Sequence, residues 1–138
     1  MAVIPDSDLQ SALNARLDTL DDGLEVAWEN INFLPVSGTP YLRAWLLPAE
    51  PSIATLGNSP WQERRGVFQV DCFYPTGQGP GPAKLKAAAL VALFKAGTRL
   101  TYNTLEVTCE KAWPGPAMVE DGWYHVPVSV MYSCYSNA

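Results

Sequence analysis

The sequence predicts a single α+β domain over residues 1–138, in which two helices pack on one face of an antiparallel mixed sheet of about four to five strands. Two segments have the composition and spacing of helices, at 6–20 and 83–96. The segments between and after them alternate in polarity or are rich in aliphatic and aromatic residues, as strands are. Loops, rather than helices, join most neighbouring strands, which favours antiparallel pairing with the helices on one side.

Residues 6–20 predict an amphipathic helix. Asp6 or Ser7 is a suitable N-cap, and Asp8 lies where the helix dipole favours a negative charge. Gly23 ends the pattern. Four leucines recur at spacings of four, four and three, which places them on one helical face: Leu9, Leu13, Leu17 and Leu20.

Two strands are predicted next, at 24–29 and 41–48, with a loop between them that contains Pro35, Gly38 and Pro40. The second strand reads "YLRAWLLP". In a regular pleat its Arg43 shares a face with the two flanking aromatic residues.

Residues 50–65 show no clear period and predict a long loop or arm. Connections of this length are uncommon in compact domains and are usually functional or mobile. Residues 65–74, "RGVFQVDCFY", then alternate clearly. Phe68, Val70 and Cys72 fall on one face and Gln69 and Asp71 on the other, which predicts a half-buried antiparallel strand.

The stretch "FYPTGQGPGPAK" at 73–84 has the strand–glycine–helix context of a phosphate-binding loop. Such a loop needs convergent backbone N–H groups, and Pro80 and Pro82 have none. No G-K-[ST] follows, and the glycine spacing does not match G-x-G-x-x-G. We therefore interpret the stretch as a stiff bend into the helix at 83–96, which Gly97 ends.

The C-terminal part predicts one or two strands at 98–112, a loop at "WPGPAMVEDG" and a long last strand at 123–134. Pro127 lies within that last strand and cannot donate a ladder hydrogen bond. It therefore favours an edge position or a bulge.

No catalytic, cofactor-binding or metal-binding residue is predicted. His125 is the only histidine, and its neighbours offer no nucleophile, so we expect a surface or edge side chain. Asp71 and Glu110 are expected at solvated cross-strand positions rather than as an acid–base pair. Three scattered cysteines without C-x-x-C spacing, Cys72, Cys109 and Cys134, indicate reduced thiols in the core rather than disulfides or a zinc site.

The charge of the chain also bears on its partners. The net charge of −5 argues against a protein that grips nucleic acid, and no apolar run is long enough for a membrane span. The N-terminus lacks the features of a secretory signal. Charged residues are only 17% of the chain, against about 25% in typical domains. A surface so poor in charge indicates that another subunit covers part of it.

Candidate interface residues follow from the same observations. Trp61 lies in the predicted arm beside Arg64 and Arg65, and Trp113 lies in a proline-rich loop. Tryptophan and arginine dominate the energetics of protein interfaces. With Arg43 of the second strand they form the predicted interface set, and the chain is expected to be an assembly protein rather than an enzyme.

The sequence resembles the tail-terminator-like proteins of tailed bacteriophages. The resemblance covers nearly the whole chain and is carried by "WENINFLPVSGTPYLRAWLLPAE", "RRGVFQVDCFYPTGQGPGPA" and "DGWYHVPVSVMY". It implies a structural virion protein, assembled in the host cytoplasm, that forms a homo-oligomeric ring, typically a hexamer, at the head-proximal end of the tail. Its implied partners are the tail tube protein and a head–tail connector or neck protein, with DNA passing through the lumen without specific binding.

Three other interpretations remain open at this stage. The first is a neck or head–tail connector, or another minor tail protein of similar fold. The second is a small enzyme of phosphate or acyl chemistry, for which His125 has no visible partner. The third is a stand-alone monomeric binding module, which light scattering would distinguish from a ring.

Overall fold

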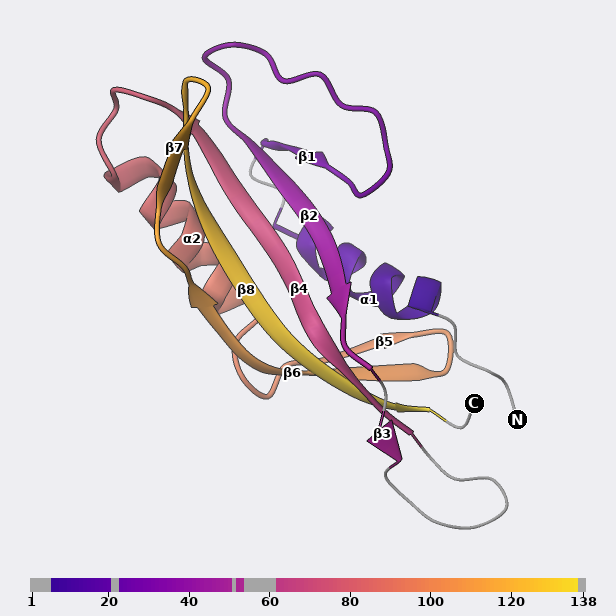
Figure 1. Cartoon of the computed structure of the whole chain (residues 1–138). Helices are drawn as coiled ribbons and strands as arrows, with labels where there is room; N and C mark the ends of the chain where they lie inside the picture. The colour runs from indigo at the N-terminus through magenta and orange to yellow at the C-terminus, as the bar shows by residue number, and fades with distance from the viewer. Residues whose placement is uncertain (1–5, 21–22, 51, 54–61, 137–138) are drawn as a thin grey trace.

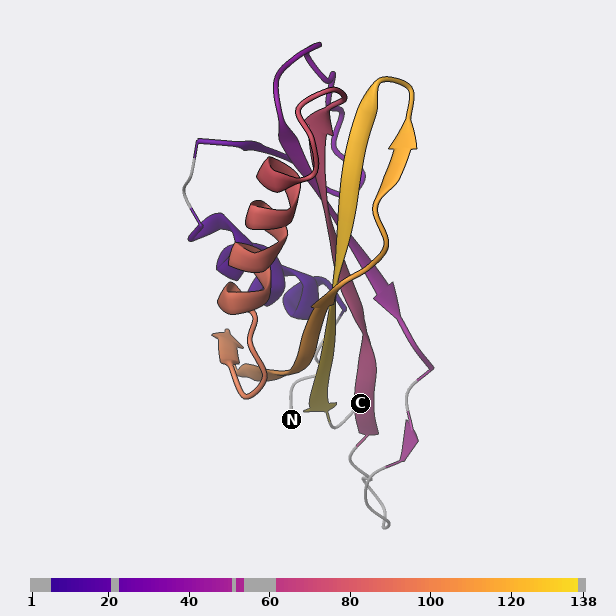
Figure 2. The same cartoon turned by 90° about the vertical axis from the view of Figure 1, so that its left-hand side faces the viewer.

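The computed structural model describes residues 6–20, 23–50, 52–53 and 62–136, and has two layers (Figures 1 and 2). Both helices lie on the same face of one curved sheet, as predicted. Neither described helix is long and apolar enough to cross a membrane. The elements in chain order are α1 (Asp6–Asp18), β1 (Glu25–Ala27), β2 (Tyr41–Pro48), β3 (Ser52–Ile53), β4 (Gln62–Pro75), α2 (Gly81–Leu93), β5 (Arg99–Tyr102), β6 (Leu105–Pro114), β7 (Met118–Glu120) and β8 (Trp123–Ser136).

The predicted α+β class is confirmed, but the predicted number of strands is wrong. The described residues form eight strands, because the arm contributes β3, the segment 98–112 divides into β5 and β6, and β7 lies inside a predicted loop. β3 and β7 have two and three residues, which is too short for an alternating pattern to be recognised. Their pairing with β4 and β8 is set by the partner strands rather than by their own sequence.

The sheet is built around β4 and β8, which pair antiparallel over 14 residues each. The strand order is β1-β2-β4-β8-β6-β5, with β3 and β7 attached to β4 and β8. One pair departs from the antiparallel arrangement, because β1 runs parallel to β2. The loop between them, residues 28–40, returns the chain from the end of β1 to a point beside its first residue, so that β2 can run in the same direction as β1.

The hydrophobic core lies between the sheet and the helices. Alternate residues of the long strands face the helices, and Phe68, Val70 and Cys72 are fully buried there as their spacing predicted. The leucine face of α1 is buried in the same cluster, and Phe94 after α2 contacts Phe68 with ring centroids 5.7 Å apart. Apolar periodicity therefore predicted the core side of β4 and of α1 correctly.

β6 changes faces halfway along its length. Its register with β8 shifts between Cys109 and Lys111, a β-bulge that inserts one extra residue. Leu105, Val107 and Cys109 point into the core before the bulge. After it, Lys111 and Trp113 pair with residues of β8 that point away from the helices. The bulge therefore places Trp113 on the opposite face from the one that simple alternation gives.

Pro127 lies in the interior of the sheet, so the prediction of an edge strand is wrong. β8 has β4 on one side and β6 and β7 on the other. The carbonyl of Pro127 accepts a hydrogen bond from the Gly115 amide in the connection between β6 and β7. The N–H and C=O groups of one strand residue point to the same side. The nitrogen of Pro127 therefore faces the connection between β6 and β7 rather than β4, and its missing N–H costs no ladder hydrogen bond to β4.

The glycine stretch is the bend that the sequence predicted. β4 ends at Pro75, and α2 begins at Gly81 with Pro82 in its first turn. Gly77 and Gly79 both have φ in the left-handed region, at 93° and 74°, which residues with a side chain rarely adopt. The sharp reversal between strand and helix therefore depends on glycine at these positions.

Candidate functional site

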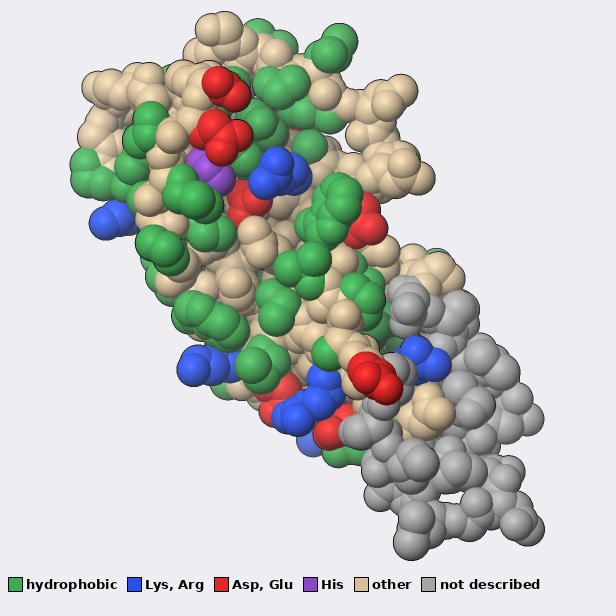
Figure 3. All heavy atoms as spheres, in the orientation of Figure 1, with side chains coloured by type: hydrophobic (Ala, Val, Ile, Leu, Met, Phe, Trp, Pro, Cys, Tyr) green, Lys and Arg blue, Asp and Glu red, His purple; other side chains and the backbone are tan. Residues whose placement is uncertain are grey.

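The candidate site is the face of the sheet opposite the helices, which neither helix covers (Figures 2 and 3). Paired strands place side chains in rows across this face. One row contains Trp45, Gln69, Ser129 and Trp113, and the next contains Leu47, Val67, Met131 and Lys111. We call this surface the uncovered face; its other members include Tyr41, Arg43, Arg65, Asp71, Phe73, Trp123, His125, Pro127 and Ser133.

Apolar side chains run along the middle of the uncovered face, and charged side chains lie toward both of its ends (Figure 3). Trp45 is 46% exposed and Leu47 is 45% exposed, which is unusual for large apolar residues of a paired strand. A contiguous apolar patch with polar surroundings is typical of protein interaction sites. The arrangement is therefore suited to binding another protein chain.

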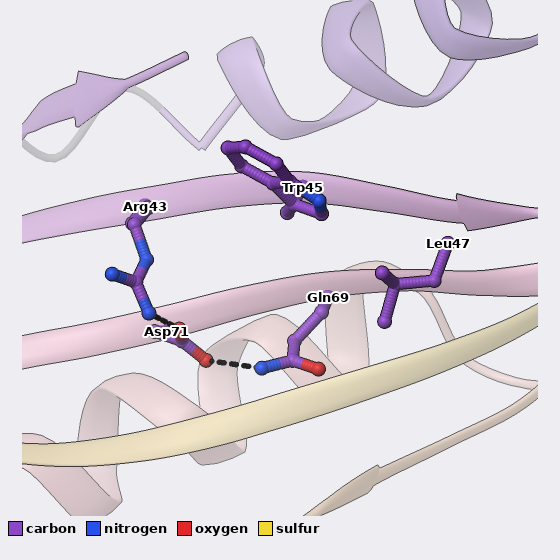
Figure 4. Close-up of a pocket in the computed structure, with 5 residues that line it drawn as sticks. All are labelled: Arg43, Trp45, Leu47, Gln69 and Asp71. Atoms are coloured by element: carbon purple, nitrogen blue, oxygen red, sulfur yellow. Dashed lines mark hydrogen bonds and ion pairs between the residues drawn. The ribbon is translucent and has the colours of Figure 1, made fainter. Parts of the chain in front are cut away.

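An ion pair lies within this surface (Figure 4). The Arg43 guanidinium donates to the Asp71 carboxylate over 2.6 Å, and Gln69 Nε2 donates to the other carboxylate oxygen over 3.0 Å. Together with Trp45 and Leu47 these side chains line a shallow hollow of ≈ 300 Å³. The guanidinium also lies 5.0 Å from the centre of the Phe73 ring, where a cation is attracted by the ring electrons.

Asp71 is 3% exposed, so the prediction of a solvated position is wrong. Alternation assigned Asp71 to the correct face of β4 but could not show that Arg43 is its register partner in β2. A buried carboxylate must be paired or hydrogen-bonded, and both Arg43 and Gln69 fulfil that need. Arg43 therefore stabilises its own chain in addition to any contact that it makes with a partner.

Stacked rings continue the uncovered face toward loop 28–40. Phe33 of the loop contacts Tyr41, and Tyr41 stacks on Phe73 with centroids 4.7 Å apart. Phe73 in turn stacks on His125 at 4.6 Å. Burial raises the pKa of the Tyr41 phenol; the nearby Arg43 lowers it and Asp71 raises it further. The stack fixes the base of the loop against the sheet.

His125 is 5% exposed, so the expected surface or edge position is also wrong. Its strand is central, and its ring is one member of the aromatic stack. Neither ring nitrogen has a hydrogen-bond partner among the described residues. The position is that of a packing residue, and a single histidine in a strand carried no signal that would have predicted its burial.

The other predicted interface residues are divided between two faces. Arg65 and Trp113 lie on the uncovered face with Arg43, whereas Arg64 lies on the helix side of β4. Arg65 is 3.6 Å from the Glu63 carboxylate, and the Lys111 ammonium lies 5.1 Å from the centre of the Trp113 ring. Trp61 and most of the predicted arm lie outside the described residues, so their role stays a prediction.

The remaining polar predictions concern the cysteines and Glu110. Cys72, Cys109 and Cys134 are buried in the core and form no disulfide, as predicted. Burial raises the pKa of the Cys109 thiol to about 11, although the charge of Arg16 acts in the opposite direction. Glu110 is exposed at the bulge, as expected, and accepts a hydrogen bond from the Ser133 hydroxyl. The described residues contain no group of three acidic, histidine or cysteine side chains placed to hold a metal ion.

Loop 28–40 carries an exposed apolar surface that the sequence analysis missed. Ile31, Leu34 and Val36 are 63%, 88% and 64% exposed. The available signal was the presence of three large apolar side chains in a loop that also contains Pro35, Gly38 and Pro40. From its sequence the segment was expected to be only a connection between two strands.

Comparisons with known proteins agree with this architecture. A family model described as phage tail terminator protein matches residues 8–132. Nine chains of solved structures match as well. One of these is 31% identical in sequence and has a TM-score of 0.77, and the match covers 95% of this chain and 96% of that one. No curated protein matches the chain.

Proposed function

We propose a specific role for this chain, which belongs to the phage tail terminator family and is a structural protein of a bacteriophage tail. In this proposal six copies of the chain form a ring that caps the tail tube. In this role the ring ends polymerisation of the tube at its head-proximal end. It then presents a surface to the connector or neck protein of the capsid.

The observation that carries the proposal is the uncovered face. Trp45 and Leu47 of β2 are about half exposed there, on the side of the sheet that neither helix covers. In an isolated domain this surface would stay in contact with water, whereas covering it with a partner would contribute roughly 25 cal/mol of free energy for each Å² of apolar area buried. We propose that the tail tube protein covers it, with Trp45, Leu47 and Trp113 as the central apolar contacts.

Charge supports a ring through which DNA passes. The chain has a net charge of −5, and proteins that hold nucleic acid neutralise phosphates with clustered lysine and arginine. An acidic ring repels the phosphate backbone instead. This property suits a lumen that lets DNA pass without binding it.

The test is to add the protein to polymerising tail tube protein and to measure tube lengths by electron microscopy. We expect tubes to stop growing with the protein at one end. A Trp45→Ser, Leu47→Ser variant should lose this activity and keep the fold, whereas Tyr102→Ser, which removes an exposed ring from β5, should cap normally. Tubes of unchanged length with the wild-type protein would refute the proposal, and binding to the neck protein alone would assign the chain to the neck.

A further inference from the structure

Acidic and basic residues are segregated along this chain. Between Arg16 and Arg43 every charged residue is acidic, and between Asp71 and Glu106 every charged residue is basic. The first segment contains β1 and loop 28–40, and the second contains α2 and β5. A folded domain does not require such a separation, so the two segments are candidates for complementary surfaces.

The two segments lie on opposite flanks of the molecule. β1 and β2 form one end of the strand order, and loop 28–40 projects from that flank (Figure 1). α2 packs chiefly against β8, with further contacts to β4 and β6 on either side of it, and these three strands lie beyond β2 in the order. Asp18 and Glu25 are exposed on the first side, and Lys84 and Lys95 are exposed on the second. Among the described residues, none forms an ion pair with Glu25 or Lys84.

Each flank also carries an apolar feature, a projecting loop on one and a groove on the other. On the β1 flank, loop 28–40 presents Ile31, Leu34 and Val36 to solvent. On the α2 flank there is a groove of ≈ 410 Å³ between the helix and the end of β6. Its lining is apolar except for one lysine at its rim: Lys84, Ala87, Ala88, Val91, Pro114, Gly115 and Val126.

The loop is held in place, so its apolar residues are presented rather than free to collapse. Glu29 accepts hydrogen bonds from the Leu46 amide over 2.9 Å and from Gln10 over 3.0 Å. Phe33 packs on Tyr41, and the Thr39 amide closes a turn onto the carbonyl of Val36. A loop that is ordered before binding loses little conformational entropy on association.

We propose that copies of this chain join head to tail, with loop 28–40 of one copy seated in the groove beside α2 of the next. Leu34 and its apolar neighbours enter the groove, and the acidic residues around β1 face the lysines of α2. Because the two surfaces differ, the contact is heterologous and repeats in one direction until the ring closes. This inference rests on the proposed function, since it specifies the contact between copies that a tail-capping ring needs.

Cysteine cross-linking tests the contact directly. The native cysteines are buried, so Leu34→Cys and Ala88→Cys, both at exposed positions, introduce the reactive thiols. Under mild oxidation each single variant should remain uncross-linked, whereas a mixture of the two should give dimers. A chain with both substitutions should give a ladder that ends in a closed ring. Leu34→Cys with Tyr102→Cys, whose second thiol lies on β5, is the matched control and should give no ladder.

Charge exchange provides an independent measurement. Glu25→Lys in the Leu34→Cys chain, or Lys84→Glu in the Ala88→Cys chain, should lower the cross-linking yield by about two- to fivefold at low salt. Combining the two reversed chains should restore it. Circular dichroism should show that all the variants keep the fold, because both charged residues are exposed.

Two results would overturn the inference. One is a disulfide between two Leu34→Cys copies, which would indicate a symmetric contact. The other is the absence of mixed dimers both in the free protein and in the presence of tail tubes. The tube-length assay on the same samples separates the two proposals: capping without cross-linking refutes this contact alone, whereas tubes that keep growing refute the capping function.

Discussion

Replacing Arg43 with methionine should destabilise the isolated chain, because it leaves the Asp71 carboxylate buried without its cation. The Asp71 side chain is 4% exposed and the Arg43 side chain is 48% exposed. Removing one partner of a fully buried ion pair costs about 3–5 kcal/mol, and an exposed pair contributes at most about 1 kcal/mol. The half-exposed arginine and the remaining hydrogen bond from Gln69 place the expected loss between these limits, at about 2 kcal/mol.

The assay is equilibrium unfolding in urea. For a domain of this size a loss of about 2 kcal/mol lowers the midpoint by roughly 1 M. Adding Asp71→Asn to the Arg43→Met variant should recover much of the loss, because no charge then remains buried. Lys111→Met is the matched control: it removes an exposed cation of the same face that lies over the Trp113 ring, and should change stability by less than about 0.5 kcal/mol.

A stability for Arg43→Met within about 0.5 kcal/mol of the wild type would refute this account of the ion pair. If the same variant were fully stable but no longer capped tubes, Arg43 would be an interface residue whose guanidinium binds the partner. Loss of both stability and capping by Arg43→Met, with capping restored in the double variant, would show that its effect on assembly follows from the fold.

Two further predictions concern packing and pH. Gly66→Ala should lower the free energy of unfolding in urea by about 2 kcal/mol or more, because the added Cβ would lie 2.5 Å from the Tyr132 hydroxyl and 2.6 Å from the Leu47 carbonyl. The control is Gly81→Ala, whose Cβ meets open space and should leave stability unchanged. Equal stabilities of the two variants would contradict the close approach at Gly66. Burial raises the pKa of Cys109 to about 11, whereas a thiol in the unfolded chain ionises near pH 8.5. The buried neutral thiol therefore contributes fully to folding stability below about pH 8.5, and this contribution is lost as the pH rises through about 11. Cys109→Ala should therefore lose less stability over this interval, and parallel stability curves of the two proteins would refute the shift.

β6 shows where the alternation of polarity along a strand predicts burial correctly and where it stops doing so. Alternation placed Leu105, Val107 and Cys109 on one face, and all three are buried. Continuing it would also send Trp113 into the core, but the bulge before Lys111 turns Trp113 to the uncovered face. The position of the bulge depends on how β6 pairs with β8, which lies later in the chain. Trp113 was expected at an interface because its sequence predicts a loop, whereas in the structure it lies in a strand beside Ser129.

Burial of the polar residues was the part that pattern could not predict. Asp71 and His125 are each on the face that alternation assigns to them, yet both are buried rather than solvated. Their burial comes from neighbours distant in sequence: Arg43 and Gln69 around the carboxylate, and Phe73 against the imidazole ring. A local period reports which face a side chain occupies but not which side chains lie beside it on that face.

The sequence by itself determined the two helices, the long strands, the glycine bend at 73–84 and the core side of β4, because these depend on propensities and periods within one segment. It also supported the family, which the match over residues 8–132 confirms. Only the tertiary structure decided the parallel β1, the interior position of Pro127, the Arg43–Asp71 pair and the exposure of loop 28–40. Each of these depends on which strands become neighbours, and that choice is made by packing between segments far apart in the chain.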